Sequence, residues 1–419
     1  MKTPVIRTAV WGLICVLLLA LTGCAPASSP SSAVLPESSA VHDTTAAETP
    51  DSTAPTADAA PEDTAASEAE DPSVLPLSRQ HYDKLDDTQR QLYSEMYAIV
   101  SAFAETGPLS PAPKEALDAA FLALCEDHPE LFWLTSYSGS YTSLDDVVTS
   151  VEFRPGYSIT AAEKPALTAA LESRRDELLN AMNAELPADA SDADRAYYLF
   201  NAIIQNTFYD QFTPADQLAD QSAVSCLVDG WAVCAGYARA LQYLLMSADI
   251  PCSTVSGTAN GMPHSWVLAQ LDGEWYHMDP TWADSDELFG GRELLLCEYF
   301  VMTTEQLLLS HTPQADDLPL CTAEDADIFV RRGTRLAQWD TIALENLLRE
   351  AAAAGEHALS LELTDPAAWS SARAALDNGE MLRLLRSVAD TVPALDTRSL
   401  QYYPNDTRQV LHLILTYTQ

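Results

Sequence analysis

A two-residue turn signal constrains the fold of this chain more than any other feature. Asp272-Gly273 separates two apolar runs, at residues 265–271 and 274–279. An Asp-Gly pair between such runs is the strongest short-range indication of a β-hairpin with a two-residue loop. In that hairpin Leu271 faces Glu274. This pair sets the register of both strands, because a slip of one residue would turn every side chain to the opposite face.

The register brings a histidine and a carboxylate together. Continued to the far ends of the two runs, it places His264 opposite Thr281 and Trp266 opposite Asp279, all on one face. Asp279 is then the diagonal neighbour of His264, at about 7 to 8 Å between backbones. A carboxylate there can accept a hydrogen bond from one imidazole nitrogen and so orient the other.

A cysteine lies where a helix is expected to begin. Gly230 can break the chain ahead of a helix that starts near Cys234, and Ala238, Leu241 and Leu245 then follow at helical spacing. The unpaired N–H groups and positive end of a first turn stabilise a thiolate over a thiol. The alternative is a small buried apolar residue, since unpaired cysteines are among the most buried residue types.

Cys234, His264 and Asp279 together predict a Cys-His-Asp triad. The imidazole would take the thiol proton, the thiolate would attack a carbonyl or carboxamide carbon, and the carboxylate would hold the ring in its useful tautomer. The sequence therefore predicts acyl transfer through a thioester.

Three motifs resemble those of the transglutaminase-like superfamily. They are residues 230–238 (Gly-Trp-Ala-Val-Cys-Ala-Gly-Tyr-Ala), His264-Ser-Trp-Val, and residues 275–282 (Trp-Tyr-His-Met-Asp-Pro-Thr-Trp). The resemblance is strong over about residues 192–284. It implies a papain-like α+β core, with the nucleophile's helix packed on an antiparallel sheet. It also implies that Cys234 is the nucleophile, His264 the base and Asp279 the residue that orients the base.

The N-terminus has the features of an export signal. Lys2 and Arg7 precede an uncharged apolar run at residues 9–21, which is shorter than the roughly 20 residues that a membrane-spanning helix needs. Leu21-Thr22-Gly23-Cys24 resembles the lipobox of bacterial lipoproteins. That resemblance implies cleavage before Cys24, lipidation of its thiol, and an extracytoplasmic protein anchored to the cell membrane. The alternative is an ordinary signal peptide with a chance cysteine.

The segment that follows has a biased composition. Residues 25–75 contain no Lys or Arg and consist almost entirely of Ser, Thr, Ala, Pro, Asp and Glu. Such a segment buries too little apolar surface to offset the ordering cost of about 1 to 2 kcal/mol per residue. We therefore expect a disordered acidic tether.

Periodicity and composition divide the chain into five parts. We expect a signal peptide at 1–23, the tether at 24–75, an N-terminal helical region at 76–155, a catalytic core at 156–310 and a small C-terminal α/β accessory domain at 311–419. Helices are expected near 92–100, 114–125, 161–186, 192–208, 341–354, 369–377 and 381–389, and further strands at 147–153, 358–363, 400–403 and 410–417.

Other residues near the motifs carry less information. His277 is interpreted as a packed or hydrogen-bonded strand histidine. Trp231 and Gln205 could supply an oxyanion donor beside the Cys234 N–H, although a core aromatic and a solvated helix residue are the simpler interpretations. Residues 284–286 lack the glycine and distal glutamate of a calcium loop, and no zinc-ligand spacing occurs, so neither a metal nor a cofactor is predicted. The sequence leaves open the pairing of the remaining mature cysteines, Cys125, Cys226, Cys252, Cys297 and Cys321.

The charge balance limits the partners. The 419 residues include 22 Lys and Arg against 61 Asp and Glu, a net charge of −39. Phosphate backbones would be repelled, so nucleic acid is excluded as a partner. A peptide, protein or cell-wall substrate remains, with hydrolysis by a cysteine peptidase or amidase favoured over cross-linking. The alternative is a noncatalytic binding module displayed at the cell surface. The oligomeric state is left open.

Overall fold

The computed structural model describes residues 80–145, 147–211, 220–285 and 294–418, together with the backbone of residues 6–15. All of these residues belong to one compact unit. The predicted tether and the lipidation of Cys24 lie outside the described residues. Within the described residues, no helix combines the length and apolar character that crossing a membrane requires.

Two helices follow the start of the folded region, as predicted. Helix α1 (Asp87–Ser101) begins at an Asp86 capping box, in which the Asp86 side chain accepts from the Gln89 N–H and the Gln89 side chain from the Asp86 N–H. Leu92, Met96 and Val100 face the core with Tyr93. Helix α2 (Lys114–Asp127) packs against α1.

The same region also contains a sheet that its sequence indicated only in part. Its strand order is β1-β3-β4-β2, with β1 at Ile6–Cys15, β2 at Gly107–Leu109, β3 at Leu134–Leu144 and β4 at Val147–Tyr157. Strand β3 is rich in Ser, Thr and Gly, so its apolar alternation is weak and no strand was predicted there. Strand β1 falls within the predicted signal peptide, so the processed chain expected from the lipobox would lack it.

Three helices form the helical half of the core. They are α3 (Lys164–Glu185), α4 (Asp192–Asn206) and α5 (Cys234–Ser247), all at predicted positions. A π-helical turn, η2 (Ser225–Asp229), and two short parallel strands, β5 (Phe208–Tyr209) and β6 (Trp231–Ala232), lead into α5. Gly230 makes this turn with φ 74°, a left-handed conformation that favours glycine.

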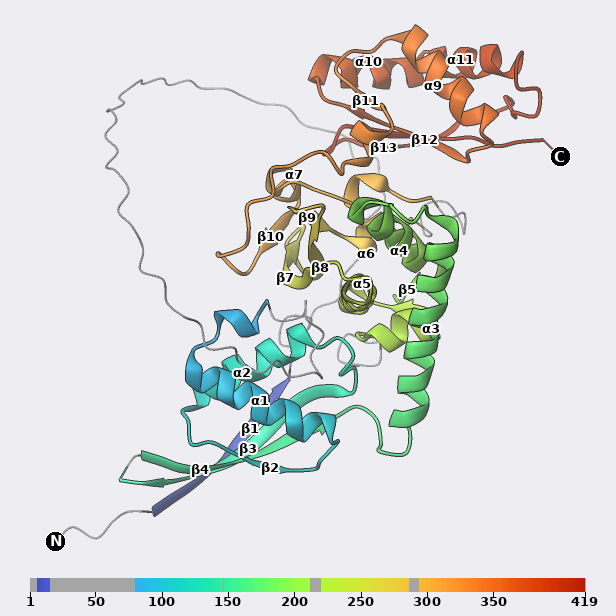
Figure 1. Cartoon of the computed structure of the whole chain (residues 1–419). Coiled ribbons are helices and arrows are strands. Elements are labelled where there is room, and N and C mark those ends of the chain that lie inside the picture. The colour runs from blue at the N-terminus through green and yellow to red at the C-terminus, as the bar shows by residue number, and fades with distance from the viewer. Residues whose placement is uncertain (1–5, 16–79, 146, 212–219, 286–293, 419) are drawn as a thin grey trace, which may run out of the picture. The chain divides into compact units, whose positions relative to one another are not determined.

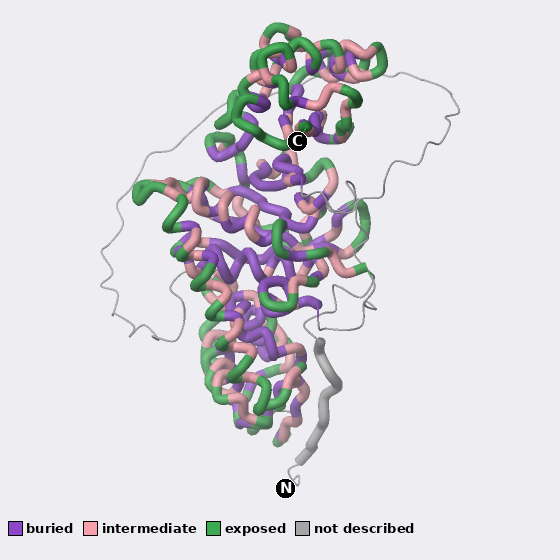
Figure 2. Tube along the Cα trace, turned by 90° about the vertical axis from the view of Figure 1, so that its right-hand side faces the viewer, coloured by how far each residue is buried: buried purple, intermediate pink, exposed green. Residues whose placement is uncertain are grey.

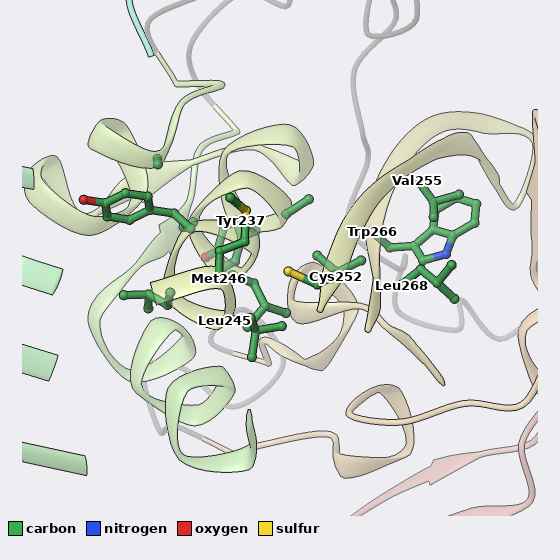
Figure 3. Packing of buried hydrophobic residues seen from close by; sticks show 14 of the residues in the cluster. Tyr237, Leu245, Met246, Cys252, Val255, Trp266 and Leu268 are labelled. Carbon is green, nitrogen blue, oxygen red and sulfur yellow. The ribbon is translucent and has the colours of Figure 1, made fainter. Parts of the chain in front are cut away.

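An antiparallel sheet forms the other half, in the order β10-β7-β8-β9. Its strands are β7 (Cys252–Ala259), β8 (Met262–Leu271), β9 (Glu274–Met278) and β10 (His311–Pro313). Helix α5 packs against β7 and β8 (Figure 1). Figure 3 shows this core, with Leu245 and Met246 from the helix and Cys252, Val255, Trp266 and Leu268 from the strands. The predicted α+β core is confirmed. Its sheet extends past residue 310, because β10 pairs with β7.

The hairpin has the predicted turn and register. Leu271 pairs with Glu274, and the two turn residues, Asp272 and Gly273, both have positive φ (52° and 94°), as a type I′ turn requires. The Asp272 carboxylate also accepts from the Asp192 N–H (2.9 Å) at the start of α4. The turn residue thus helps to fix α4 against the sheet.

The ladder ends earlier than the sequence predicted. Its last pair is Val267 with Met278, so Trp266 does not pair with Asp279 as expected. The Asp279 N–H instead donates to the Tyr299 carbonyl (2.9 Å), and Asp279 caps the short helix α6 (Pro280–Ala283). Pro280 explains the change, since proline cannot donate to a ladder but suits the first turn of a helix.

The C-terminal part combines helices and strands around its own core. Its sheet has the order β11-β12-β14-β13, and helices α9, α10 and α11 lie beside it (Figure 1). Buried side chains of these helices and of β12 and β14 form one hydrophobic cluster. The elements are α8 (Ile328–Arg331), β11 (Arg335–Leu336), α9 (Thr341–Ala353), β12 (Ala358–Leu363), α10 (Pro366–Asp377), α11 (Glu380–Ala389), β13 (Gln401–Asn405) and β14 (Val410–Ile414). Figure 2 shows buried positions in the interior of this part and exposed ones at its surface.

Buried polar contacts join the C-terminal part to the segment that follows α6. Glu298 belongs to the short helix η3 (Cys297–Tyr299), and its Oε1 accepts from Asn405 Nδ2 (3.0 Å). Its Oε2 lies 3.0 Å from His412 Nε2, and Arg408 donates to its carbonyl (3.0 Å). Burial alone would raise the pKa of Glu298, but His412 outweighs it and the pKa is lowered. Glu298 is therefore bonded to the C-terminal part, and its neighbour Tyr299 provides the carbonyl that accepts from the Asp279 N–H.

Candidate active site

Cys234 is the first residue of α5, as predicted, and is 2% exposed. The Val233 N–H donates to the Asp220 carbonyl (3.0 Å), which fixes the approach to the helix. Gly236 is required beside it, because a Cβ there would lie 2.7 Å from the same carbonyl oxygen. The Gly236 N–H donates to the carbonyl of the N-cap residue Val233 (2.9 Å), and the positive end of the helix favours negative charge at Cys234.

The sulfur of Cys234 takes part in a disulfide bond. The other cysteines of the described region, Cys125, Cys226, Cys252, Cys297 and Cys321, are all unpaired and buried. Every measurement on the Cys234 thiol therefore begins with reduced protein.

His264 and Asp279 are in contact. His264 Nε2 lies 2.8 Å from Asp279 Oδ2, and both side chains are buried. An ionised carboxylate can only accept hydrogen bonds, so Nε2 of the histidine carries the proton in this pair. In the neutral ring Nδ1 is then the basic nitrogen. The structure thus brings together the histidine and the carboxylate that the hairpin predicted, although Asp279 reaches His264 from a helix cap.

The Asp279 carboxylate accepts four hydrogen bonds. Oδ1 accepts from the backbone N–H groups of Thr281 (3.0 Å) and Trp282 (3.1 Å), and Oδ2 accepts from His264 and from His311 Nε2 (3.0 Å). Burial alone would raise the pKa of this carboxyl group. The two histidines, His264 foremost, more than reverse that effect and lower the pKa well below its usual value. Asp279 is therefore ionised.

Sequence reasoning missed His311. It is a single histidine in a stretch without periodicity, and it reaches Asp279 only because β10 pairs with β7. Gly257 of β7 makes that approach possible, because a Cβ there would lie 2.3 Å from the Thr312 carbonyl oxygen and 2.8 Å from the Trp266 ring. No local sequence pattern predicts the contact between His311 and Asp279, because it depends on the pairing of β10 with the distant strand β7.

The remaining sequence candidates have different positions. His277 is buried and its Nδ1 accepts from Trp266 Nε1 (3.2 Å), as expected for a hydrogen-bonded strand histidine. Burial, and then repulsion from His311, lowers its pKa to about 4, so it is neutral at neutral pH. Gln205 is exposed on α4, in agreement with a solvated helix residue. Trp231 was expected in the core, but it is 47% exposed.

Trp231 lines a cavity close to Cys234 in the chain. The cavity has a volume of about 630 Å³ and lies between α3, η2 and the β5–β6 pair. Phe208 and Trp231 occupy paired positions on the two strands, with ring centroids 5.2 Å apart, and both are about half exposed. Two residues separate Trp231 from Cys234, so their Cα atoms are at most about 11 Å apart. Arg174 and Glu177, 2.8 Å apart, supply a charged edge from α3.

Among the residues that the structure describes, two groups of buried side chains have the composition of metal ligands. They are His264, Asp279 and His311, and Cys297, Glu298 and His412, each with candidate ligand atoms within 4.8 Å of one another. In the first group, the 2.8 and 3.0 Å contacts are hydrogen bonds from imidazole to carboxylate, which account for this arrangement without an ion. His264, Asp279 and His311 therefore form a hydrogen-bonded cluster.

A family comparison agrees with this geometry. Residues 180–280 match the model of the transglutaminase-like superfamily, and this range includes Cys234, His264 and Asp279. The segment 180–280 is transglutaminase-like. No curated protein matches the chain.

Several solved structures are similar to part of the chain. A transglutaminase is 13% identical over 34% of this chain and 43% of its own, with a TM-score of 0.25. A candidate cysteine protease from Cytophaga hutchinsonii is 15% identical over 35% and 58%, with a TM-score of 0.22. The periplasmic domain of TgpA from Pseudomonas aeruginosa is 17% identical over 36% and 74%, with a TM-score of 0.23. The chain thus covers less than two thirds of the first two proteins.

Proposed function

We propose that this protein is a thiol-dependent acyl-transfer enzyme that acts on peptide or carboxamide bonds. The observation that carries the proposal is the buried contact between His264 and Asp279, in the same transglutaminase-like segment as a cysteine at a helix N-terminus. A histidine held by an ionised carboxylate is suited to act as a general base, and a first-turn cysteine is suited to ionise. The alternative is a noncatalytic binding module with the same fold.

The proposed reaction has two steps. His264 Nδ1 takes the thiol proton of Cys234, and the thiolate attacks the carbonyl carbon, with the Cys234 N–H facing the developing oxyanion. The amine then leaves with the proton from His264, and a thioester remains on Cys234. Water resolves the thioester in hydrolysis, with His264 taking its proton, and an amine resolves it in cross-linking.

Hydrolysis is the favoured second step. Water is the default acceptor unless a site excludes it. The cavity beside β6, the strand that leads into the Cys234 helix, is lined by half-exposed Phe208 and Trp231, so this face is open to solvent. We propose that the same cavity holds part of a peptide or cell-wall substrate, since exposed aromatic faces with a few polar neighbours are typical of ligand sites.

One assay tests both the activity and the acceptor. Reduced full-length protein is incubated with cell-wall fragments and a labelled amine, and free carboxylate and incorporated label are measured. We expect Cys234-dependent release of free carboxylate with little label. Cys234→Ala should abolish it, whereas Cys252→Ala, at another buried cysteine, should not.

Other results would change the proposal. Dominant incorporation of label would favour cross-linking. Binding of fragments without any product would favour the noncatalytic module. Trp231→Ala should raise KM by about 10-fold, as expected for an aromatic contact with substrate, while Trp369→Ala in α10 should leave KM unchanged. Equal KM values for the two variants would remove the cavity from the proposed site.

We also propose that the protein is a lipoprotein held at the cell surface through Cys24. The support is the Leu21-Thr22-Gly23-Cys24 sequence at the end of the apolar run. The intact mass of the protein from the membrane fraction should correspond to a chain that starts at Cys24 and carries acyl groups. A chain that starts elsewhere, or one without acyl mass, would contradict the anchor.

A further inference from the structure

We propose that His311 is a positioning residue of the acyl-transfer site. By donating from Nε2 to Asp279, it keeps that carboxylate ionised and oriented for His264. The geometry that supports this role is the 3.0 Å contact between His311 Nε2 and Asp279 Oδ2, with both side chains fully buried. The inference rests on the proposed function, because it concerns the same site, but it can be tested separately.

The hydrogen bonds around His311 define its proton positions. The ionised carboxylate only accepts, so His311 Nε2 is the donor. The other nitrogen, Nδ1, lies 2.8 Å from Ser310 Oγ. In the neutral ring the serine hydroxyl donates to Nδ1, so Ser310 and Asp279 together select one tautomer. His311 therefore donates to Asp279 through a proton on Nε2.

His311 has titratable and aromatic neighbours. Among the described residues, Asp279, His264 and His277 are the titratable groups beside it, and Trp266 and Trp282 cover the ring at centroid distances of 5.2 and 4.6 Å. His264 becomes an imidazolium when Cys234 ionises, and its ring centroid lies 5.4 Å from that of His311. His311 therefore lies next to the charge that His264 gains, and both rings donate to the same carboxylate oxygen, Oδ2 of Asp279.

The contribution of His311 follows from the burial of Asp279. A fully buried carboxylate is costly unless donors surround it, and His311 provides one of the four. With that donor removed, the pKa of Asp279 rises and the carboxylate becomes neutral more easily. A neutral partner no longer stabilises the His264 imidazolium, so the thiolate of Cys234 forms only at higher pH.

The test measures alkylation of Cys234, which requires no substrate. Reduced full-length protein and the variants His311→Leu and His311→Gln are treated with iodoacetamide between about pH 5 and 9, the range over which histidine and thiolate titrate. Rate constants come from mass spectrometry of the Cys234 peptide. The matched control is His277→Asn, which alters a buried histidine outside the cluster of His264, Asp279 and His311 that does not donate to Asp279.

We expect His311→Leu to slow alkylation of Cys234 at neutral pH by about 10- to 100-fold, which is the effect of losing one hydrogen bond to a charged group. We also expect the acid limb, the pH range over which the alkylation rate rises as the thiolate forms, to shift to higher pH. His311→Gln keeps an N–H donor and should restore most of the rate and the position of the limb. His277→Asn should change neither.

Two results would overturn the inference. In one, His311→Leu alkylates at the wild-type rate with an unshifted limb. In the other, His311→Leu and His311→Gln lose stability equally, and their alkylation rates depend on pH as in His277→Asn. His311 would then be a packing residue only. Slow alkylation of the wild-type protein itself would instead contradict the proposed function.

Discussion

Iodoacetamide is expected to alkylate Cys234 at least about 100-fold faster than any other cysteine of the described region when reduced protein is treated at neutral pH. The helix N-terminus and an imidazolium at His264 both favour the thiolate of Cys234, so its pKa should fall below the ordinary value of about 8.5. Burial acts in the opposite direction on the others. It raises the pKa of Cys321 to about 11 and that of Cys226 and Cys297 to about 12, and it raises those of Cys125 and Cys252 further.

Variants assign the effect to its causes. His264→Ala should slow alkylation of Cys234 by about 10-fold or more, because the positive partner of the thiolate is removed. Cys252→Ala should leave the rate unchanged, since Cys252 is a buried strand residue. Mass spectrometry of the labelled peptides gives each rate. If Cys234 reacts slowly, only above the pKa of an ordinary thiol and at the same rate in His264→Ala, it is a packing residue and the noncatalytic alternative is favoured.

Asp279→Asn is expected to lower both reactivity and stability. The carboxylate accepts four hydrogen bonds, two on each oxygen. An asparagine that keeps its oxygen toward Thr281 and Trp282 would turn an NH₂ group toward two imidazole N–H donors. Those buried donors would then lose their acceptor, at a cost of about 2 to 5 kcal/mol in the free energy of unfolding. Turnover should fall by about 100-fold or more, because the imidazole loses both its orientation and its charge partner.

Chemical denaturation and the alkylation assay measure the two effects on reduced protein. The control is Asp284→Asn, since Asp284 accepts from the Tyr237 hydroxyl (2.6 Å) and an amide oxygen can still accept that bond. Because folding lowers the pKa of Asp279, its stabilisation is fully present above the unfolded value of about 3.9 and is lost as the pH falls through the lower folded value. An Asp279→Asn protein as stable and as reactive as Asp284→Asn would mean that the carboxylate has no special role.

The C-terminal part is connected to Asp279 through the backbone of Tyr299. The Asp279 N–H donates to the Tyr299 carbonyl, and Asn405 donates to both the Tyr299 hydroxyl and Glu298. The C-terminal part therefore lies against the segment that holds the helix cap of Asp279. This arrangement gives the accessory part a structural link to the site, which its sequence pattern did not indicate.

Local sequence determined the elements and the hairpin. The Asp272-Gly273 pair set the turn and register, because positive φ at both positions is available to few residues. Apolar spacing set α1, α4 and α5, and with it the position of Cys234 at a helix start. These features depend on residues close together in the chain, and so the contact between His264 and Asp279 could be predicted.

Tertiary structure alone decided the rest. His311 joins Asp279 because β10 pairs with β7 beside Gly257, a contact between segments far apart in sequence. Pro280 ended the ladder, so Asp279 became a helix cap that collects four donors instead of a strand residue. Trp231 is exposed on β6 whereas its neighbour Ala232 is buried, although the apolar character of Trp231 alone predicted burial. Local propensity specifies which residues can form an element, whereas burial, donor count and partners depend on which distant elements pack together.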